Sequence, residues 1–351
     1  MKKSLFFAVL VLTLAVPLTI CAEMTKISIE RKSQESPPSY RYQSVNKALS
    51  DIFSISSNQI QPEDNCANLE ILRTEYPTFF DHSTKRLLLS IDGRYIMVYV
   101  RRPDDSSENV QLATEGANII SSMLPIYEQY FSPYPCNNIY INAFDDAAYA
   151  YASPGYISVG GANGVNSWTL LGHEFTHHYF HSAMSYSWLA EGAAQFLPYV
   201  NHYQQLRNGT TTLRELYGDY SSFDFTFNDF VANEMSNWAK SSLEQDGISP
   251  DTPLCAVDTD LEKGADLGLL FMTDAYLNMG EGNYLNAMAT LYERYRITKQ
   301  KNAYSDIMKV FEYFTPADKQ DFLKNVRRKL CQPVKVIQWP HLDRTQVMIG
   351  R

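Results

Sequence analysis

The sequence predicts an α+β fold in which a small mixed sheet leads into a pair of helices and a helical C-terminal lobe. Three observations support this prediction. Apolar and polar residues alternate between 86 and 100 and again at 139–144, as in half-buried strands. Apolar residues at helical spacing fill 107–124, between those strands. From residue 167 onward the pattern is almost wholly helical, so the sheet belongs to the first part of the chain.

Composition and charge exclude some classes of partner. The 351 residues are 45% hydrophobic and 20% charged, an ordinary balance for a folded chain with a real core. Acidic residues outnumber basic ones, 39 to 30, and the formal net charge is −9. No basic stretch interrupts this excess. We therefore expect no electrostatic binding of nucleic acid or of an anionic membrane surface.

The first 22 residues have the pattern of a secretory signal peptide. Lys2 and Lys3 precede an uncharged apolar run at 5–20, which ends at Cys21 and a small residue. The run is too short for a membrane anchor and is interrupted by Pro17. Lipid attachment at Cys21 is disfavoured because the preceding residue, Ile20, is large. The sequence thus predicts an exported protein, periplasmic or secreted, with no membrane span after residues 1–22 are removed.

Cysteine usage agrees with export. Four cysteines remain beyond the signal peptide: Cys66, Cys136, Cys255 and Cys331. They allow two disulfides in three pairings, with free buried thiols as the alternative. Their wide spacing argues against a zinc knuckle.

The chain divides into three parts after the signal peptide. Residues 23–82 form a polar segment or linker with one short helix at 44–55, and they are a candidate inhibitory pro-segment. Residues 83–205 form an α+β lobe, in which an Asp-Gly turn joins two strands as a hairpin. Residues 206–351 form the helical lobe. Further expected elements are a strand at 155–159 and helices at 168–181, 188–199, 264–279, 284–295 and 317–330.

One short motif in the first of these later helices carries metal chemistry. His173 and His177 are four residues apart, so their imidazoles lie on one helix face and can bind a single zinc ion. Glu174 projects about 100° around the helix from His173, where it can reach a water on that metal without binding the metal itself.

The motif requires a third ligand, and spacing restricts its identity. A metzincin would continue with glycine and a third histidine, but Phe180 and Ala183 occupy those places. A carboxylate is the alternative. Glu191 lies within the otherwise apolar helix at 188–196, where its charge requires a compensating cation.

These two motifs together resemble the gluzincin metallopeptidases, most closely their peptidase MA-like branch. The resemblance covers about residues 83–330 and includes a glycine-containing helix at 264–280. It implies a zincin-like metallopeptidase fold and one Zn²⁺ per chain, held by His173, His177 and Glu191. It also implies Glu174 as the catalytic acid/base and a peptide or protein as substrate. Thirteen residues separate His177 from Glu191, a short spacer that suits this branch.

The chain departs from aminopeptidase relatives at two places. Residues 154–161, which match their amine-binding segment, contain no acid, so we favour an endopeptidase. Alignment of the later helix on Gly268 puts Ala265 where those relatives carry an oxyanion-stabilising tyrosine. The oxyanion donor is therefore unassigned, with Tyr199, Tyr217 and Tyr220 as candidates.

Supporting roles fall to residues close to the motif. Gln195, one turn beyond Glu191, is a candidate to accept a hydrogen bond from a ligating histidine. We interpret His181 as a surface or outer-shell histidine and His178 as solvated. The strand at 156–159 is expected to pair with an extended substrate.

Two alternatives to the endopeptidase stay open at this point. One is an aminopeptidase that anchors the substrate amine through Asp145 or Asp146. The other is a non-catalytic cell-envelope binding protein on the same fold, which would recognise protein or glycan through its aromatic surface.

Overall fold

A computed structural model describes residues 24–29, 39–56, 66, 85–91, 94–101, 106–145, 150–160, 167–180, 183–209, 226–257 and 261–331. The proposed signal peptide, His181, Tyr217, Tyr220 and Asp146 lie outside these residues. The strands are β1 (Met24–Ile29), β2 (Lys85–Ile91), β3 (Arg94–Arg101), β4 (Asn138–Asp145), β5 (Tyr151–Ser153) and β6 (Tyr156–Gly160).

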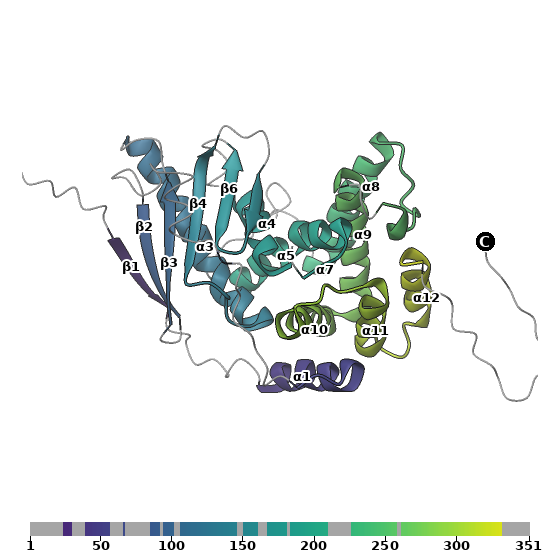
Figure 1. Cartoon of the computed structure of the whole chain (residues 1–351). Coiled ribbons are helices and arrows are strands. Elements are labelled where there is room, and N and C mark those ends of the chain that lie inside the picture. The colour runs from purple at the N-terminus through teal and green to yellow at the C-terminus, as the bar shows by residue number, and fades with distance from the viewer. Residues whose placement is uncertain are drawn as a thin grey trace, which may run out of the picture.

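Helices make up most of the rest (Figure 1). The first four long ones are α1 (Ser39–Phe53), α3 (Ser107–Phe131), α4 (Trp168–Phe180) and α5 (Ser187–Arg207). The C-terminal lobe adds α7 (Phe227–Asp229), the π-helix η4 (Phe230–Met235), α8 (Ser236–Gln245), the 3-10 turn η5 (Leu254–Ala256), α9 (Leu261–Met279), α10 (Glu281–Thr298), α11 (Tyr304–Phe314) and α12 (Gln320–Lys329). The predicted fold class, a small mixed sheet with a helix pair and a helical lobe, is confirmed.

The sheet is mixed, with the strand order β1-β2-β3-β4-β6-β5. β2 and β3 form the predicted antiparallel hairpin, in which Ile91 pairs with Arg94. β1, β4 and β6 join their neighbours in parallel, while β5 returns antiparallel to β6. Buried side chains such as Val98, Ile141 and Ile157 supply the core on this sheet, consistent with the alternation in the sequence.

The expectation that strand 156–159 pairs with substrate is wrong in its location. That strand, β6, lies inside the sheet, because β4 and β5 pair with its two sides. The strand at this edge of the sheet is β5, a strand that the sequence pattern does not predict. An added strand needs an unpaired edge, and β5 is the last of the described strands on this side of the sheet, so β5 replaces β6 as the strand expected to pair with an extended peptide.

Helix α3 is longer than the pattern at 107–124 predicts. Ser106 caps its first turn by accepting a hydrogen bond from the Asn109 amide at 3.3 Å. The helix then continues through Pro125 to Phe131, because buried Tyr127 and Phe131 extend its apolar face. Packing on that face offsets the hydrogen bond that the proline removes. Together α3 and α4 pack against the sheet (Figure 1).

The N-terminal segment contributes a helix to the C-terminal lobe. α1 packs against α10 and α11, as Figure 1 shows below the lobe. Its last residue, Phe53, lies under the guanidinium of Arg294, 5.0 Å from the ring centroid. The domain limits drawn from the sequence stay a prediction.

The four cysteines form two disulfides, Cys66–Cys136 and Cys255–Cys331. This selects one of the three pairings that the sequence allowed. The first bond ties residue 66 to the loop between α3 and β4, and the second ties η5 to the end of α12.

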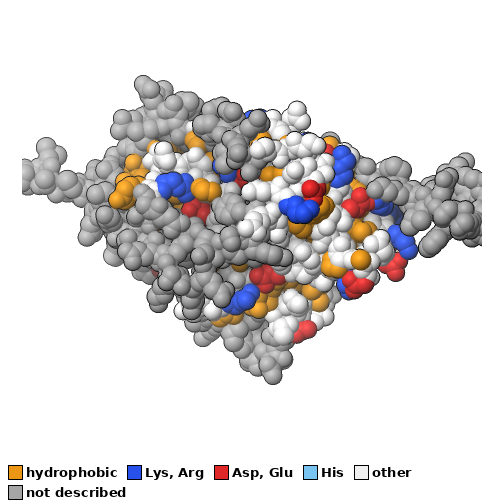
Figure 2. Space-filling model, turned by 90° about the horizontal axis from the view of Figure 1, so that it is seen from below, with side chains coloured by type: hydrophobic (Ala, Val, Ile, Leu, Met, Phe, Trp, Pro, Cys, Tyr) orange, Lys and Arg blue, Asp and Glu red, His pale blue; other side chains and the backbone are white. Residues whose placement is uncertain are grey.

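Among the described residues, no helix is both long and apolar enough to cross a bilayer. Figure 2 shows the face seen from below, where acidic and basic side chains are interspersed among neutral ones. Lys47 and Asp51 of α1, for example, form an ion pair at exposed positions.

Candidate metal centre

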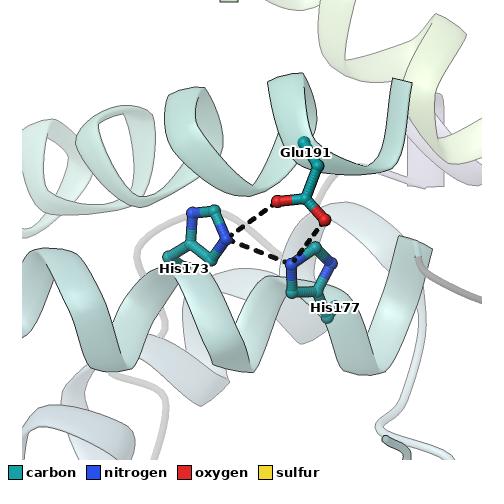
Figure 3. A group of neighbouring side chains, drawn as sticks. All are labelled: His173, His177 and Glu191. Carbon is teal, nitrogen blue, oxygen red and sulfur yellow. Dashed lines mark hydrogen bonds and ion pairs between the residues drawn. The ribbon is translucent and has the colours of Figure 1, made fainter. Parts of the chain in front are cut away.

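Two histidines of the centre come from one face of α4. His173 and His177 point from this helix toward α5 (Figure 3). The opposite side of α4 carries Leu171, Phe175 and Tyr179, all buried in the core. The helical spacing of these apolar residues thus fixes which way the two imidazoles point.

The third member comes from the next helix. α5 brings Glu191 over the two imidazoles, with its carboxylate toward both (Figure 3). His173 Nε2 lies 3.2 Å from one carboxylate oxygen and His177 Nε2 lies 3.4 Å from the other. The two Nε2 atoms are 3.1 Å apart. The structure therefore brings all three predicted ligands together, with their ligand atoms within 4.8 Å of one another.

These separations fit a single zinc ion. Zinc binds histidine nitrogen and carboxylate oxygen at about 2.0–2.2 Å in a tetrahedral arrangement, which places neighbouring ligand atoms about 3.3 Å apart. The two Nε2 atoms lie 3.1 Å apart, close to this value, and each lies 3.2–3.4 Å from a different oxygen of the Glu191 carboxylate. Two imidazoles and one carboxylate are also a donor set that zinc accepts and that leaves a fourth position open.

The charges of the centre are those that a cation requires. Burial alone would raise the pKa of Glu191, but hydrogen bonds from His173 and His177 hold it well below its usual range. Burial also lowers the pKa of His177. A charged carboxylate beside a neutral imidazole is the protonation state that binds metal.

Glu174 lies next to His173 and Glu191, and one of its carboxylate oxygens has no hydrogen-bond partner among the described residues. Its side chain is buried, and its Oε2 atom accepts no hydrogen bond from any residue that the structure describes. A buried carboxylate oxygen without a protein partner is suited to accept a hydrogen bond from a water or a substrate group in the site. Burial raises the pKa of Glu174 to about 7, against the opposing effect of His173. A carboxyl with that pKa can both take and give a proton near neutrality.

A close helix crossing fixes the position of Glu191. The following residue, Gly192, faces Gly268 of α9, and a Cβ on Gly192 would lie 2.7 Å from the Gly268 carbonyl oxygen. A Cβ on Gly268 would collide with the carbonyl oxygen of Trp188. Only glycine permits this approach at both positions. The contact with α9 therefore fixes the rotation of α5 about its own axis and its position along that axis. The glycine-containing helix singled out in the sequence thus supports the ligand helix.

The structure does not test the roles expected of Gln195, as a hydrogen-bond acceptor for a ligating histidine, and of Tyr199, as an oxyanion donor. Gln195 is half-buried on α5, and its Oε1 atom has no hydrogen-bond partner among the described residues, so its outer role stays a prediction. Tyr199 packs edge-on to Trp168, with ring centroids 5.0 Å apart, and burial raises its pKa. Asp145 ends β4, and its side chain is not among those described.

The interpretation of His178 as solvated is wrong. Its side chain is buried, with Nδ1 2.7 Å from the Tyr134 hydroxyl and Nε2 3.1 Å from the Tyr156 carbonyl oxygen. Burial lowers its pKa to about 3. A signal was present in the sequence, because position 178 follows Leu171 and Phe175 at helical spacing on the buried face. Tyr134, its partner, was not identified from sequence.

Comparison with known proteins gives distant structural likenesses only. No family model matches the chain, and no curated protein matches it. A solved M1 zinc metallopeptidase from Deinococcus radiodurans is 14% identical, with a TM-score of 0.46, over 69% of this chain and 51% of its own. A variant of the Deinococcus enzyme bound to a Tyr-Ser-Ala substrate is 15% identical, with a TM-score of 0.48, over 72% and 53%.

A two-domain M1 zinc metallopeptidase variant bound to L-tryptophan is similar to the same degree, at 14% identity and a TM-score of 0.48. The chain spans about half the length of these solved structures. They are zinc metallopeptidases, as are the gluzincins that the two motifs resemble.

Proposed function

We propose that this chain is a zinc-dependent metallopeptidase that hydrolyses peptide bonds. One observation carries the proposal: His173, His177 and Glu191 each bring a ligand atom within 4.8 Å of the others, beside a buried glutamate whose Oε2 has no hydrogen-bond partner among the described residues. Zinc held there supplies Lewis acidity to the scissile carbonyl and acidifies water. That combination is the chemistry of amide hydrolysis.

The protein's own groups then have distinct tasks. Glu174 accepts a proton from the attacking water at Oε2 and delivers it to the leaving amine. Its buried surroundings keep bulk water from competing for that proton. Edge strand β5 holds the substrate in an extended conformation through backbone hydrogen bonds.

Cleavage within chains is the preferred specificity. The β5–β6 hairpin, residues 151–160, carries no acid to bind a free α-amine. An aminopeptidase is the second candidate, because Asp145 pairs with Gly160 and so places an acid beside this hairpin. Peptides with blocked and free amino termini distinguish the two. We expect equal cleavage of both, and loss of cleavage on blocking would favour the aminopeptidase.

The same proposal includes export to the periplasm or the cell exterior. The pattern of residues 1–22 and the two disulfides support it, since disulfides persist in oxidising compartments. Amino-terminal sequencing of the mature protein should begin after residue 22. A mature protein that still contains residues 1–22 would contradict this part of the proposal.

Replacement of the proposed acid/base tests the activity. Glu174→Gln keeps the size of the side chain and all three metal ligands but cannot take a proton. We expect a loss of about 10²-fold or more in kcat at unchanged zinc content. Glu244→Gln, at an exposed position on α8, is the control and should cleave like the wild type. A Glu174→Gln variant with wild-type kcat would exclude this mechanism, and an inactive wild type with bound zinc would favour the non-catalytic binding protein.

A further inference from the structure

A closed hydrogen-bond network lies directly behind the metal centre. The His178 ring contacts the Tyr156 carbonyl through Nε2 and the Tyr134 hydroxyl through Nδ1. Because a carbonyl only accepts, Nε2 carries the hydrogen and Nδ1 accepts from Tyr134. The same hydroxyl accepts a hydrogen bond from the Gly155 amide at 3.1 Å. Both ring nitrogens and the hydroxyl are therefore in use.

The backbone of Tyr134 is held just as firmly. Its amide donates to the Glu128 carboxylate at 2.9 Å, and its carbonyl accepts from the Arg94 guanidinium at 2.6 Å. Arg94 and Glu128 also form an ion pair with each other. Arg94 lies on β3 and Glu128 is buried on α3, so Tyr134 is fixed to the sheet and to α3 at once.

The network ends at the turn between β5 and β6, which sets the direction of the edge strand β5. Gly155 has φ +84° and, with its neighbour in sequence Pro154, connects β5 to β6. Its carbonyl accepts from the Tyr140 amide at 2.8 Å, so the turn is held from β4 as well. His178 follows His177 directly on α4. One set of hydrogen bonds thus joins the metal-ligand helix to the turn of the β5–β6 hairpin.

Packing alone does not explain why the His178 imidazole and the Tyr134 hydroxyl are polar groups in this part of the core. The rings of Phe175 and Tyr134 lie 5.3 and 5.7 Å from the His178 ring, and an apolar side chain would fill the same space without the cost of burying an imidazole. Hydrogen bonds differ from apolar contacts in being directional. They fix how far α4 is rotated about its axis and how far it lies from the turn.

We propose that Tyr134 and His178 are positioning residues that set the distance between the metal centre on α4 and the substrate edge at β5. This inference rests on the proposed peptidase function. Neither residue touches the reacting atoms. They act by holding the extended peptide, which pairs with β5, in register with Glu174 and the metal ligands.

The test compares two tyrosines that both bond to α4. Tyr134→Phe removes the hydroxyl of the network. Tyr127→Phe is the matched control: Tyr127 is equally buried, and its hydroxyl bonds to Thr176 of α4, but it connects that helix to α3 alone. Tyr134→Phe loses two buried hydrogen bonds, those to His178 and from Gly155, and Tyr127→Phe loses one, so both variants should lose thermal stability and Tyr134→Phe should lose more.

Only Tyr134→Phe should alter substrate positioning. For an internally quenched peptide of about eight residues, we expect KM to rise about tenfold, with zinc content unchanged, whereas Tyr127→Phe keeps KM within about twofold. Hydrogen exchange gives a readout that does not depend on catalysis. The Gly155 amide should exchange faster in Tyr134→Phe and at the wild-type rate in Tyr127→Phe.

Equal KM values and equal Gly155 exchange in the two variants would overturn the positioning role. If Tyr134→Phe does not fold, His178→Gln and His178→Leu take its place. The glutamine amide can donate to Tyr156 and accept from Tyr134, so its KM should lie near that of the wild type, and the leucine variant should show the rise. An inactive wild type would instead contradict the proposed function, and Gly155 exchange would still decide whether the network holds the hairpin.

Discussion

Asn302 shows at the scale of one residue how the two ligand helices are held in register. It is fully buried, and its side-chain amide donates to the carbonyls of Ala183 and Leu291, each at 2.9 Å. Its side-chain oxygen accepts from Arg294 at 3.2 Å. Ala183 lies in the turn between α4 and α5, so this one side chain ties the end of the ligand hairpin to α10.

Truncation of this side chain should be costly. Asn302→Ala leaves buried polar groups without their partner, and we expect the free energy of unfolding to fall by about 2 kcal/mol. Urea denaturation should show a lower midpoint at an unchanged m-value. Asn237→Ala, at an exposed position on α8, should stay within about 0.5 kcal/mol of wild type. Equal midpoints for the two variants would contradict this account of Asn302.

The residues of the centre differ in how far the sequence alone predicts them. His173, Glu174 and His177 lie within one and a half turns of one helix, so their spacing determines their relation. Glu191 follows from the cost of a lone carboxylate in an apolar helix. The helical spacing indicates that His178 is buried, but its hydrogen-bond partners Tyr134 and Tyr156 are 44 and 22 residues away in the chain. No local pattern supplies partners at that distance.

At the scale of elements, the crossing of α5 and α9 is the decisive contact. Gly192 and Gly268 allow the two helices to approach so closely that no side chain fits between them. Trp188, one turn before Gly192, adds an edge-on contact with Phe271, at 5.3 Å between ring centroids. The position of Glu191 is therefore set by a helix from the C-terminal lobe.

A methyl group at this crossing should force the helices apart. Gly268→Ala is expected to lower the free energy of unfolding by about 1–3 kcal/mol and to weaken zinc binding, because Glu191 moves with α5. Gly282→Ala is the control: Gly282 lies in α10 with nothing near its Cβ position, and alanine there should stabilise by up to about 1 kcal/mol. Calorimetry and zinc titration measure both effects. Unchanged zinc affinity in Gly268→Ala would contradict the link from crossing to ligand.

Strands and helices were predictable where burial gives their apolar residues a regular spacing along the sequence. The β2–β3 hairpin, β4 and α4 lie within a few residues of their expected ranges. β1 and β5 were missed. β5 has only three residues, too few to show alternation, and β1 lies in a segment whose polar composition predicted a linker. Strand order is a property of the whole sheet, so the interior place of β6 had no local signal.

At the scale of the whole molecule, α4 and α5, which carry the candidate metal centre, lie between the sheet and the C-terminal helices (Figure 1). α4 packs on β5 and β6, α5 packs on α9, and each brings ligands to the junction. β5, the proposed substrate edge, therefore lies beside the helix that carries His173 and His177, while the helix that carries Glu191 packs on α9. The proposed site thus depends on packing against the sheet and on packing against α9.

Metal content tests the central claim most directly. After dialysis against a metal-free buffer, elemental analysis should find about one zinc per chain in the wild type and in Glu244→Gln, whose carboxylate is exposed and remote. Glu191→Gln removes one of the three ligands and should hold far less than one zinc under the same conditions. A wild type without zinc, or a Glu191→Gln variant that keeps the wild-type amount, would contradict the assignment of this centre.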